Sequence, residues 1–291
     1  MHKSGFISII GKPNVGKSSL LNALMGEKLS AVTHKAQTTR HRIFGLLNTE
    51  DYQLVLSDTP GLIKPAYLMQ EGMMKFVQES MKDADVFLLM TDVYDKFDFN
   101  EVVEKMRKSK IPMIVAINKS DLSTQEKLIE LIDKWQTLLP EAEVMPISAL
   151  FNFNLDKLLN ALLSHIPFHE PYFSKEEISN LPVRFFTSEI IREKIFLNYE
   201  KEIPYSVEVV IDGFEEEKDI TRIRAIIYVM RDSQKGIIIG KKGEALKRVG
   251  TEARKDIEVL IDKHVFLELY VKVLKDWREN KNNLKNFGLM Q

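Results

Sequence analysis

One short segment, Gly11 to Ser18, restricts the fold of this chain more than any other. It matches the pattern G-x-x-x-x-G-K-[ST] at every fixed position. The apolar run Phe6–Ile10 precedes it, and the residues from Ser18 to Met25 have helical apolar spacing. A strand, a glycine loop and a helix N-terminus in this order direct backbone N–H groups and the positive end of a helix dipole at one point. The segment therefore predicts an α/β fold with a phosphate-binding loop.

The side chains of this loop indicate a nucleotide with Mg²⁺. The Lys17 ammonium would reach the β- and γ-phosphates, and the Ser18 hydroxyl would ligate the metal. The alternative is a glycine turn that contains Lys-Ser by coincidence, which the flanking strand and helix disfavour. The predicted phosphate-binding residues are Gly11, Asn14, Val15, Gly16, Lys17, Ser18 and Ser19.

A second motif, Asp58-Thr59-Pro60-Gly61, ends the apolar strand that begins at Leu54. Asp58 can hold Mg²⁺ through its water shell, and Gly61 leaves room for its N–H to approach a γ-phosphate. A turn of this composition is common by itself. Its place at a strand end, downstream of the phosphate loop, favours the functional interpretation.

The third motif selects the base. Asn118-Lys119-Ser120-Asp121 follows the buried strand Ile111–Ile117. The Asp121 carboxylate offers two acceptors to guanine N1–H and the 2-amine, whereas adenine would leave it unpaired. Asn118 and Lys119 would support the loop and cover the base, and backbone N–H groups after the strand Val144–Ile147 would contact guanine O6. The predicted guanine site comprises Asn118, Lys119, Asp121, Ser148 and Ala149.

A polar loop with two threonines, Lys35–Arg42, lies between these motifs. A threonine there that ligates Mg²⁺ and senses the γ-phosphate would make the loop a switch, and a plain exposed basic loop is the alternative. Leu62 occupies the position where many small GTPases have the glutamine that orients water. Because an alkyl chain cannot orient water, we expect slow intrinsic hydrolysis that uses another group.

The order of these motifs is similar to that of translation-factor-type GTPases, and the strings GKPNVGKSSLLNAL and KAQTTRHR resemble the Era family. The resemblance implies GTP and GDP as ligands and Mg²⁺ as cofactor. It places the Mg²⁺- and γ-phosphate-binding threonine at Thr39, directly before Arg40. It also implies that Asn14 takes part in holding K⁺ beside the phosphates.

The length of 291 residues suits two domains, and 44% hydrophobic with 29% charged residues is typical of a globular protein. The net charge of −1 says nothing about nucleic acid. The absence of cysteine excludes disulfides, thiolate zinc sites and thiol catalysis, and it fits a reducing cytoplasm. We expect no signal peptide and no transmembrane segment, because the apolar runs are short.

Strands alternate with amphipathic helical stretches up to about Ile166, for example Gln125–Leu139 and Leu155–Leu163. Such alternation predicts a mostly parallel sheet with helices on both faces and ligands at the carboxyl ends of the strands. We expect a GTPase domain over residues 1–167, a proline-bracketed linker over 168–182 and a second domain over 183–291.

The second domain has the predicted order α-β-β-α-α-β. The helices include Ser188–Asn198 and Glu244–Ile261, and the last strand is Val265–Val273. Gly240-Lys241-Lys242-Gly243 lies between the two later helices. This arrangement resembles a type II KH domain, an α+β fold that binds RNA.

A G-x-x-G sequence alone is more often a helix connector than an RNA clamp. Here the two glycines would let a nucleic-acid backbone approach, and the two lysines would meet phosphates. From Arg231 to Asp256, eight Lys and Arg residues outweigh four Asp and Glu residues, for a net charge of +4. Ile237, Ile238 and Ile239 are candidates for the floor under unstacked bases, or plain core. The predicted RNA-binding residues are Ile238, Ile239, Gly240, Lys241, Lys242, Gly243, Lys247 and Arg248.

The resemblance to the Era family extends over essentially the whole chain. It implies binding to the 3′ end of 16S rRNA, a role in 30S subunit assembly and rRNA maturation, a monomer, and a cytoplasmic location with peripheral association with the inner face of the membrane. A tRNA-modification-type GTPase is an alternative, disfavoured because those proteins rely on a C-terminal cysteine and lack a KH domain. A nucleotide-gated RNA chaperone is the other.

Overall fold

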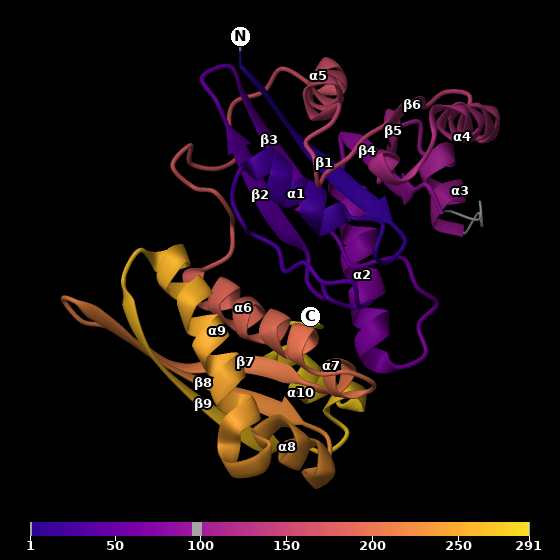
Figure 1. Ribbon diagram of the computed structural model, residues 1–291. Helices are drawn as coiled ribbons and strands as arrows, with labels where there is room; N and C mark the ends of the chain where they lie inside the picture. The colour runs from indigo at the N-terminus through magenta and orange to yellow at the C-terminus, as the bar shows by residue number, and fades with distance from the viewer. Residues whose placement is uncertain (1, 95–100, 291) are drawn as a thin grey trace. The chain divides into compact units, whose positions relative to one another are not determined.

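The computed structural model describes residues 2–94 and 101–290, which form two compact units (Figure 1). The first unit comprises Met1–Ser30, Thr39–Lys64 and Met73–Asn180. The second comprises Ala31–Thr38, Pro65–Gly72 and Leu181–Gln291. Two short segments from the N-terminal half of the sequence therefore group with the C-terminal residues.

The first unit is built on a six-stranded sheet in the order β2-β3-β1-β4-β5-β6. β2 is antiparallel to β3, and the remaining neighbours are parallel. The strands are β1 (Lys3–Gly11), β2 (Ile43–Asn48), β3 (Tyr52–Asp58), β4 (Val86–Asp92), β5 (Met113–Asn118) and β6 (Glu143–Pro146). The central strands are buried on both faces, as parallel strands between helical layers must be.

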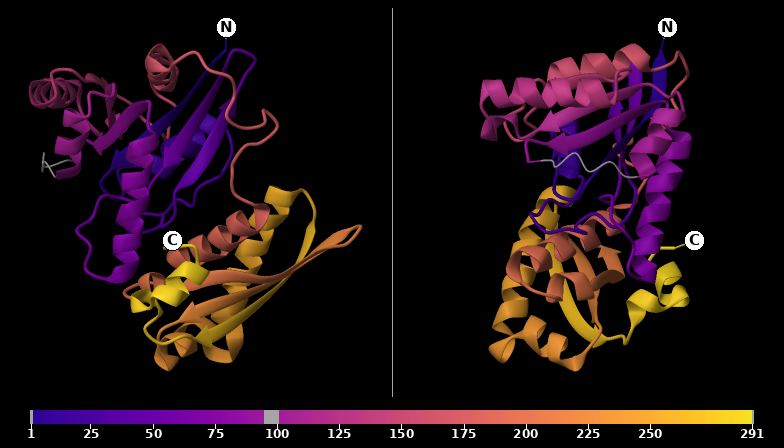
Figure 2. Two further views of the ribbon diagram at one scale, coloured as in Figure 1. Left: turned by 180° about the vertical axis from the view of Figure 1, so that it is seen from behind. Right: turned by 90° about the vertical axis from the view of Figure 1, so that its right-hand side faces the viewer.

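Helices cover both faces of this sheet (Figure 2). One face carries α2 (Leu68–Asp83), α3 (Glu101–Lys108) and α4 (Gln125–Leu138), and Val77, Met106 and Trp135 of these helices share one buried cluster with Phe87 and Val115 of the strands. The other face carries α1 (Lys17–Met25), with Leu20 and Leu21 buried, and α5 (Leu155–His165), with Leu158 and Leu162 buried. The predicted doubly covered, mostly parallel sheet is confirmed.

The second unit has a three-stranded sheet in the order β7-β8-β9, with β7 antiparallel to β8 and β8 parallel to β9. The elements are α6 (Val183–Asn198), α7 (Ile203–Ser206), β7 (Glu208–Glu216), β8 (Ile220–Val229), α8 (Asp232–Ile239), η2 (Lys241–Gly243), α9 (Glu244–Ile261), β9 (His264–Val273), η3 (Trp277–Glu279) and α10 (Lys281–Asn286). Alternate residues of β8, such as Ile223, Ala225 and Ile227, share a core with α6, α8 and α9. This is the predicted α-β-β-α-α-β order, with short helices added.

Element boundaries differ modestly from those expected. α6 begins five residues earlier than the predicted Ser188, at Val183 directly after Pro182. The apolar run Ile237–Ile239 belongs to the helix α8. Over the described part of the chain, every helix is too short or too polar to cross a membrane.

Candidate nucleotide site and candidate RNA surface

The predicted phosphate loop joins the end of β1 to the start of α1. Gly16 caps the helix with φ of 99°, and a Cβ there would lie 2.2 Å from the Asn118 Nδ2 atom. At Gly11 a Cβ would lie 2.2 Å from the Met90 carbonyl oxygen. Gly16 is therefore required by its backbone conformation and by the nearby Asn118 side chain, and Gly11 by the nearby Met90 carbonyl, in addition to any role toward a ligand.

Lys17 is buried inside this loop. Its ammonium donates to the carbonyl oxygens of Gly11, at 3.1 Å, and Lys12, at 2.9 Å. Burial lowers the pKa of Lys17 to about 8, although the neighbouring Asp58 carboxylate favours the charged form. A phosphate group beside this ammonium would stabilise its charged form and so offset the effect of burial.

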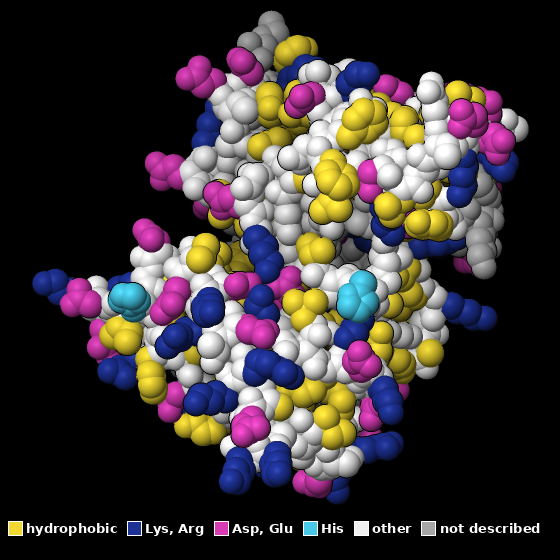
Figure 3. All heavy atoms as spheres, viewed as in Figure 1, with side chains coloured by type: hydrophobic (Ala, Val, Ile, Leu, Met, Phe, Trp, Pro, Cys, Tyr) yellow, Lys and Arg dark blue, Asp and Glu magenta, His cyan; other side chains and the backbone are white. Residues whose placement is uncertain are grey.

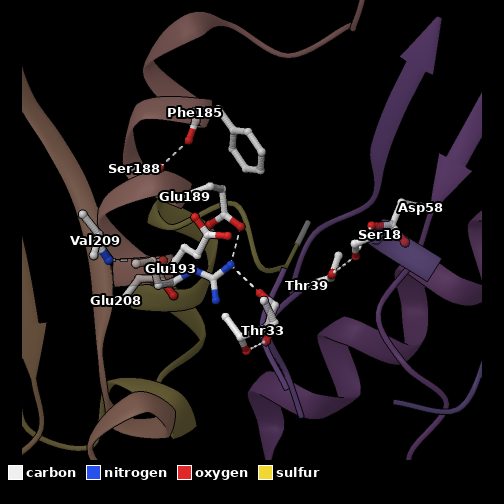
Figure 4. A network of polar contacts seen from close by, with 12 residues as sticks. Ser18, Thr33, Thr39, Asp58, Phe185, Ser188, Glu189, Glu193, Glu208 and Val209 are labelled. Atoms are coloured by element: carbon white, nitrogen blue, oxygen red, sulfur yellow. Dashed lines mark hydrogen bonds and ion pairs between the residues drawn. The ribbon is translucent and has the colours of Figure 1, made fainter. Parts of the chain in front are cut away.

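Three side-chain oxygens gather at the start of α1 (Figure 4). The Ser18 hydroxyl donates to Asp58 Oδ2 at 2.7 Å and lies 2.9 Å from Thr39 Oγ1. Asp58 is fully buried, and burial raises the pKa of its carboxyl, opposed chiefly by the Lys17 charge. Its Oδ1 accepts no hydrogen bond from the residues that the structure describes. A cluster of carboxylate and hydroxyl oxygens with an unsatisfied buried oxygen fits a hard cation such as Mg²⁺.

The loop after β3 packs directly against the phosphate loop. A Cβ at Gly61 would lie 2.7 Å from the Pro13 nitrogen, and Leu62 N donates to the Gly11 carbonyl at 3.0 Å. The Leu62 side chain is buried in the cluster that contains Val77. Leu62 is therefore a core residue, and its buried alkyl side chain cannot orient a water molecule at the phosphate loop.

Asn118, the last residue of β5, joins two other loops. Its Nδ2 donates to the Val15 carbonyl at 2.8 Å, and its Oδ1 accepts from Ala149 N at 3.0 Å. Since Asn118 is buried, both contacts are shielded from water. Side-chain bonds of this kind hold the phosphate loop and the Ser148-Ala149 loop in one arrangement.

The neighbouring residues of the third motif are held in the same way. Ser148 Oγ donates to Asp121 Oδ1 at 2.6 Å, which orients the carboxylate. The Lys119 ammonium donates to the Asn14 carbonyl at 2.8 Å and pairs with Asp92 at 2.6 Å. Sequence reasoning missed Asp92, because its place beside Asn118 follows from the register of β4 against β5, which only the folded sheet sets.

The second candidate site is the Gly240–Gly243 turn between α8 and α9. Gly240 and Gly243 have φ of 72° and 79°, and a Cβ at Gly240 would lie 2.6 Å from Ala245 Cβ. Lys241 and Lys242 are exposed between them. In Figure 3, Lys and Arg side chains spread over the face where α8 and α9 lie, with acidic side chains among them.

A groove lies beside this turn, between α9 and β9. Small and apolar residues make most of its lining, with Lys247 and Arg254 supplying positive charge; it is lined by Gly243, Leu246, Lys247, Gly250, Thr251, Arg254, Val265, Phe266, Leu267 and Leu269. Phe266 is 46% exposed, so an aromatic face is open to solvent at the groove. Sequence reasoning missed the contribution of β9, because α9 and β9 meet only in the folded unit.

The prediction for Ile238 needs correction. Ile238 is fully buried in the core of the second unit, because α8 turns it and Gln234, one helical turn earlier, to the inner face. Its side chain therefore offers no surface to a base. Ile239 is partly buried against the same core, Ile237 is half-exposed, and Lys247 and Arg248 are exposed.

Comparisons with known proteins agree with this arrangement. Residues 6–119 match the family described as 50S ribosome-binding GTPase, and residues 202–278 match the KH domain family. The chain is 44% identical over 289 residues to GTPase Era of Geotalea uraniireducens, covering 98% of this chain and 97% of the relative. It is 43% identical over 288 residues to GTPase Era of Geotalea daltonii, with the same coverage.

Two solved structures match the whole fold at a TM-score of 0.94 and 37% identity. One is an Era in complex with MgGDPNP and nucleotides 1506–1542 of 16S ribosomal RNA, with all of both chains covered. The other is a variant of Aquifex aeolicus Era bound to GDP and AlF4⁻, covering 99% of this chain and 100% of that one. The chain is therefore a GTPase that belongs to the Era family.

Proposed function

We propose that this GTPase uses bound GTP to control binding of the 16S rRNA 3′ end during assembly of the 30S subunit and rRNA maturation. A nucleotide site and an RNA-type surface in one chain support this proposal, and the relative that was solved with MgGDPNP and a 16S rRNA fragment supplies the RNA. The observation that carries the RNA half is the exposed Lys241-Lys242 pair in a glycine turn beside an open groove.

In the nucleotide site, we assign the phosphates to the loop from Gly11 to Ser19 and the Mg²⁺ ion to Ser18, Thr39 and Asp58. The support is the oxygen cluster that these three side chains form and the buried unsatisfied oxygen of Asp58. Thr39 and Gly61 would sense the γ-phosphate. Guanine would lie against Asn118, Lys119, Asp121, Ser148 and Ala149. Hydrogen bonds join Asp121 to Ser148 and Asn118 to Ala149, and Lys119 bonds the Asn14 carbonyl of the phosphate loop.

Hydrolysis is expected to be slow and to depend on K⁺. Leu62 is buried in the core, so the usual water-orienting side chain has no equivalent at that position. A monovalent cation near Asn14 would supply a fixed positive charge next to the phosphates. We expect faster hydrolysis in KCl than in NaCl, and loss of that difference in Asn14→Ala. Equal rates of the unchanged protein in the two salts would refute the K⁺ assignment.

The domain assignment is a GTPase domain over residues 1–167, a linker over 168–182 and a KH domain over 183–291. The protein is proposed to act as a monomer in the cytoplasm, and a peripheral association with the inner face of the membrane is implied by the family alone.

A nucleotide-gated RNA chaperone is a second interpretation of the same two sites. It predicts nucleotide-dependent RNA affinity without stimulation of hydrolysis by RNA.

The RNA proposal is tested by changing Lys241 and Lys242 together to Asp. Binding of single-stranded RNA with the 16S rRNA 3′-end sequence is titrated by fluorescence anisotropy at several salt concentrations. Loss of two phosphate contacts should weaken binding and reduce the slope of log affinity against log salt by roughly 1.4. The matched control changes Lys218 and Lys281, two exposed lysines outside the groove, to Asp.

Unchanged affinity and slope in the first double variant would show that the glycine turn is only a helix connector. An equal loss in both double variants would show that net charge alone is responsible. GDP affinity serves as the internal reference, because the proposed nucleotide residues all precede Leu150.

A further inference from the structure

The segment Ala31–Thr38 lies between α1 and β2 in the sequence, but its contacts place it in the second unit, against α6. Val32 N donates to Glu193 Oε1 at 2.9 Å. The Lys35 ammonium donates to the carbonyl oxygens of Phe196 and Tyr199, each at 2.5 Å. These carbonyls are at the C-terminal end of α6, where the helix dipole favours a cation.

The third contact involves the last residue of the segment. Arg192 Nη2 donates to the Thr38 carbonyl oxygen at 2.5 Å. Arg192 is 1% exposed and Thr38 is also buried, so this charge-assisted bond is shielded from solvent. Of the three contacts, it is the one nearest in sequence to Thr39.

The guanidinium of Arg192 is itself held rigidly. Its Nε donates to Glu189 Oε1 at 2.8 Å, and its Nη2 pairs with the other Glu189 oxygen. Glu193 and Glu208 are buried as well, and both raise the pKa of Arg192 against the effect of burial, after the larger contribution of Glu189. Figure 4 shows Glu189, Glu193 and Glu208 close together. Glu189 thus holds the Nε–Nη2 edge of the guanidinium, which is the edge that donates to Thr38.

The segment that Arg192 holds is also internally braced. Thr38 Oγ1 donates to the Lys35 carbonyl at 2.7 Å and lies 2.6 Å from Thr33 Oγ1. Gln37 accepts from the Tyr67 hydroxyl at 2.9 Å, and the Tyr67 ring lies under the Arg278 guanidinium at 4.6 Å. The second segment, Pro65–Gly72, thus joins the first within the same unit.

We propose that Arg192 is a positioning residue for the nucleotide switch, acting through the Thr38–Thr39 peptide group. The Thr38 carbonyl and the Thr39 nitrogen and Cα share one rigid plane, so a bond that fixes the carbonyl oxygen also fixes where Thr39 begins. The inference rests on the proposed role of Thr39 toward Mg²⁺ and the γ-phosphate. Beyond that role, we expect the Arg192 side chain, from the KH domain, to set the preference of the nucleotide site for GTP over GDP.

The test compares Arg192→Lys and Lys35→Met with the unchanged full-length chain. The affinities for Mg·GDPNP and Mg·GDP are measured by competition against a fluorescent nucleotide, well below the unfolding temperature. Arg192→Lys keeps the positive charge but loses the planar guanidinium that donates to both Glu189 and Thr38. We expect the affinity for GDPNP to fall by on the order of tenfold, which is the scale of one charge-assisted hydrogen bond. The affinity for GDP should change by less than about twofold. Lys35→Met changes only an ammonium on the segment and should shift the same ratio in the same direction.

The matched control is Lys194→Met, on the same helix. Lys194 pairs with Asp256 of α9 at 2.6 Å and, at 4.0 Å, with Glu193; within the described residues, neither of these ion pairs is made with the segment Ala31–Thr38. A purely structural loss in α6 should lower the unfolding temperature of all three variants and leave the GDPNP-to-GDP ratio unchanged. That result for Arg192→Lys and Lys35→Met would overturn the proposal.

The variant Thr39→Ala tests the role of Thr39 separately from the positioning role of Arg192. If Thr39→Ala loses the preference for GDPNP while Arg192→Lys and Lys35→Met keep it, the positioning role is refuted and the role of Thr39 stands. If Thr39→Ala keeps the preference, the proposed role of Thr39 fails, and the positioning role fails with it. A reduced ratio in all three variants, with Lys194→Met unchanged, supports both.

Discussion

Replacement of Asn118 by Ala should loosen the whole nucleotide site without altering which base it selects. The Asn118 side chain donates to the Val15 carbonyl at 2.8 Å and accepts from Ala149 N at 3.0 Å. Alanine can make neither bond. The phosphate loop and the Ser148-Ala149 loop would then lose their common anchor, whereas the carboxylate of Asp121, which would read guanine, keeps its Ser148 partner.

The size of the effect follows from the burial of these groups. Asn118, Val15 and Ala149 are all buried, so the carbonyl and the N–H that lose their partners cannot be fully compensated by water. A buried polar group left unsatisfied costs about 1–3 kcal/mol. Two such groups predict a loss of roughly 2–6 kcal/mol in the unfolding free energy of the first unit. A comparable part of the affinity for any nucleotide that needs both loops should be lost.

The assay combines urea unfolding with nucleotide titration in two backgrounds. Asp121→Asn should bind xanthine nucleotides, so Asn118→Ala is made both in the unchanged chain, titrated with GDP, and in Asp121→Asn, titrated with XDP. The loss factor should be the same in both, because the bonds to Val15 and Ala149 that Asn118→Ala removes are the same in the two backgrounds. Asn22→Ala is the control: Asn22 also bonds loop backbone, at Leu29 and Ser30, and its loss should lower stability only.

Two results would refute this reasoning. An unchanged unfolding free energy in Asn118→Ala would show that the two bonds are replaced by others. A large loss of GDP affinity with no loss of XDP affinity would show that Asn118 contacts the base instead of anchoring the loops.

Three further predictions follow from the same unit. Asp121→Asn should exchange guanine for xanthine specificity, because Ser148 can keep donating to the amide oxygen while the amide N–H₂ faces the 2-oxo group of xanthine. The binding free energy of GTP should weaken by about 2–4 kcal/mol. A titration that shows wild-type GTP affinity would disprove the assignment. The pKa of Lys17, lowered by burial to about 8, means that the folded nucleotide-free chain loses this proton before the unfolded chain does, so its stability should rise between about pH 8 and 10.5; nucleotide binding should take up a proton and weaken by up to about tenfold per pH unit above 8. Calorimetry in two buffers of different ionisation enthalpy measures that uptake, and equal heats at pH 9 would argue against it. Gly61→Ala places a Cβ 2.7 Å from Pro13 and should cost about 1–3 kcal/mol in urea unfolding, with GDPNP binding weakened more than GDP binding; a variant as stable as the unchanged chain would show that the loop can move aside.

The features that could be predicted from the sequence are those encoded by neighbouring residues. The phosphate loop was found because the apolar run before Gly11 and the helical spacing after Lys17 are local signals, and the structure has β1 and α1 there. The strand before Asn118 and the helix Glu244–Ile261 were found for the same reason. Motif order then identified the family, which the relatives confirm.

Other features depend on residues that meet only when the chain folds. Lys119 pairs with Asp92, 27 positions away, and Asn118 bonds Val15, 103 positions away, and no local pattern specifies such a pairing. Ile238 illustrates a subtler limit: the apolar run Ile237–Ile239 indicates burial, but the packing of α8 decides which of the three faces the core.

The grouping of Ala31–Thr38 with α6 shows this limit most clearly. By sequence, only the overlapping stretch Lys35–Arg42 is identified, as a polar loop that is either a switch or a plain exposed basic loop. Its position is decided by Arg192 and Glu193, about 160 residues further along the chain, which bond its backbone at Thr38 and Val32. Local propensity and motif spacing therefore determined the two sites and their elements, whereas long-range polar contacts determined which parts of the chain hold each other in place.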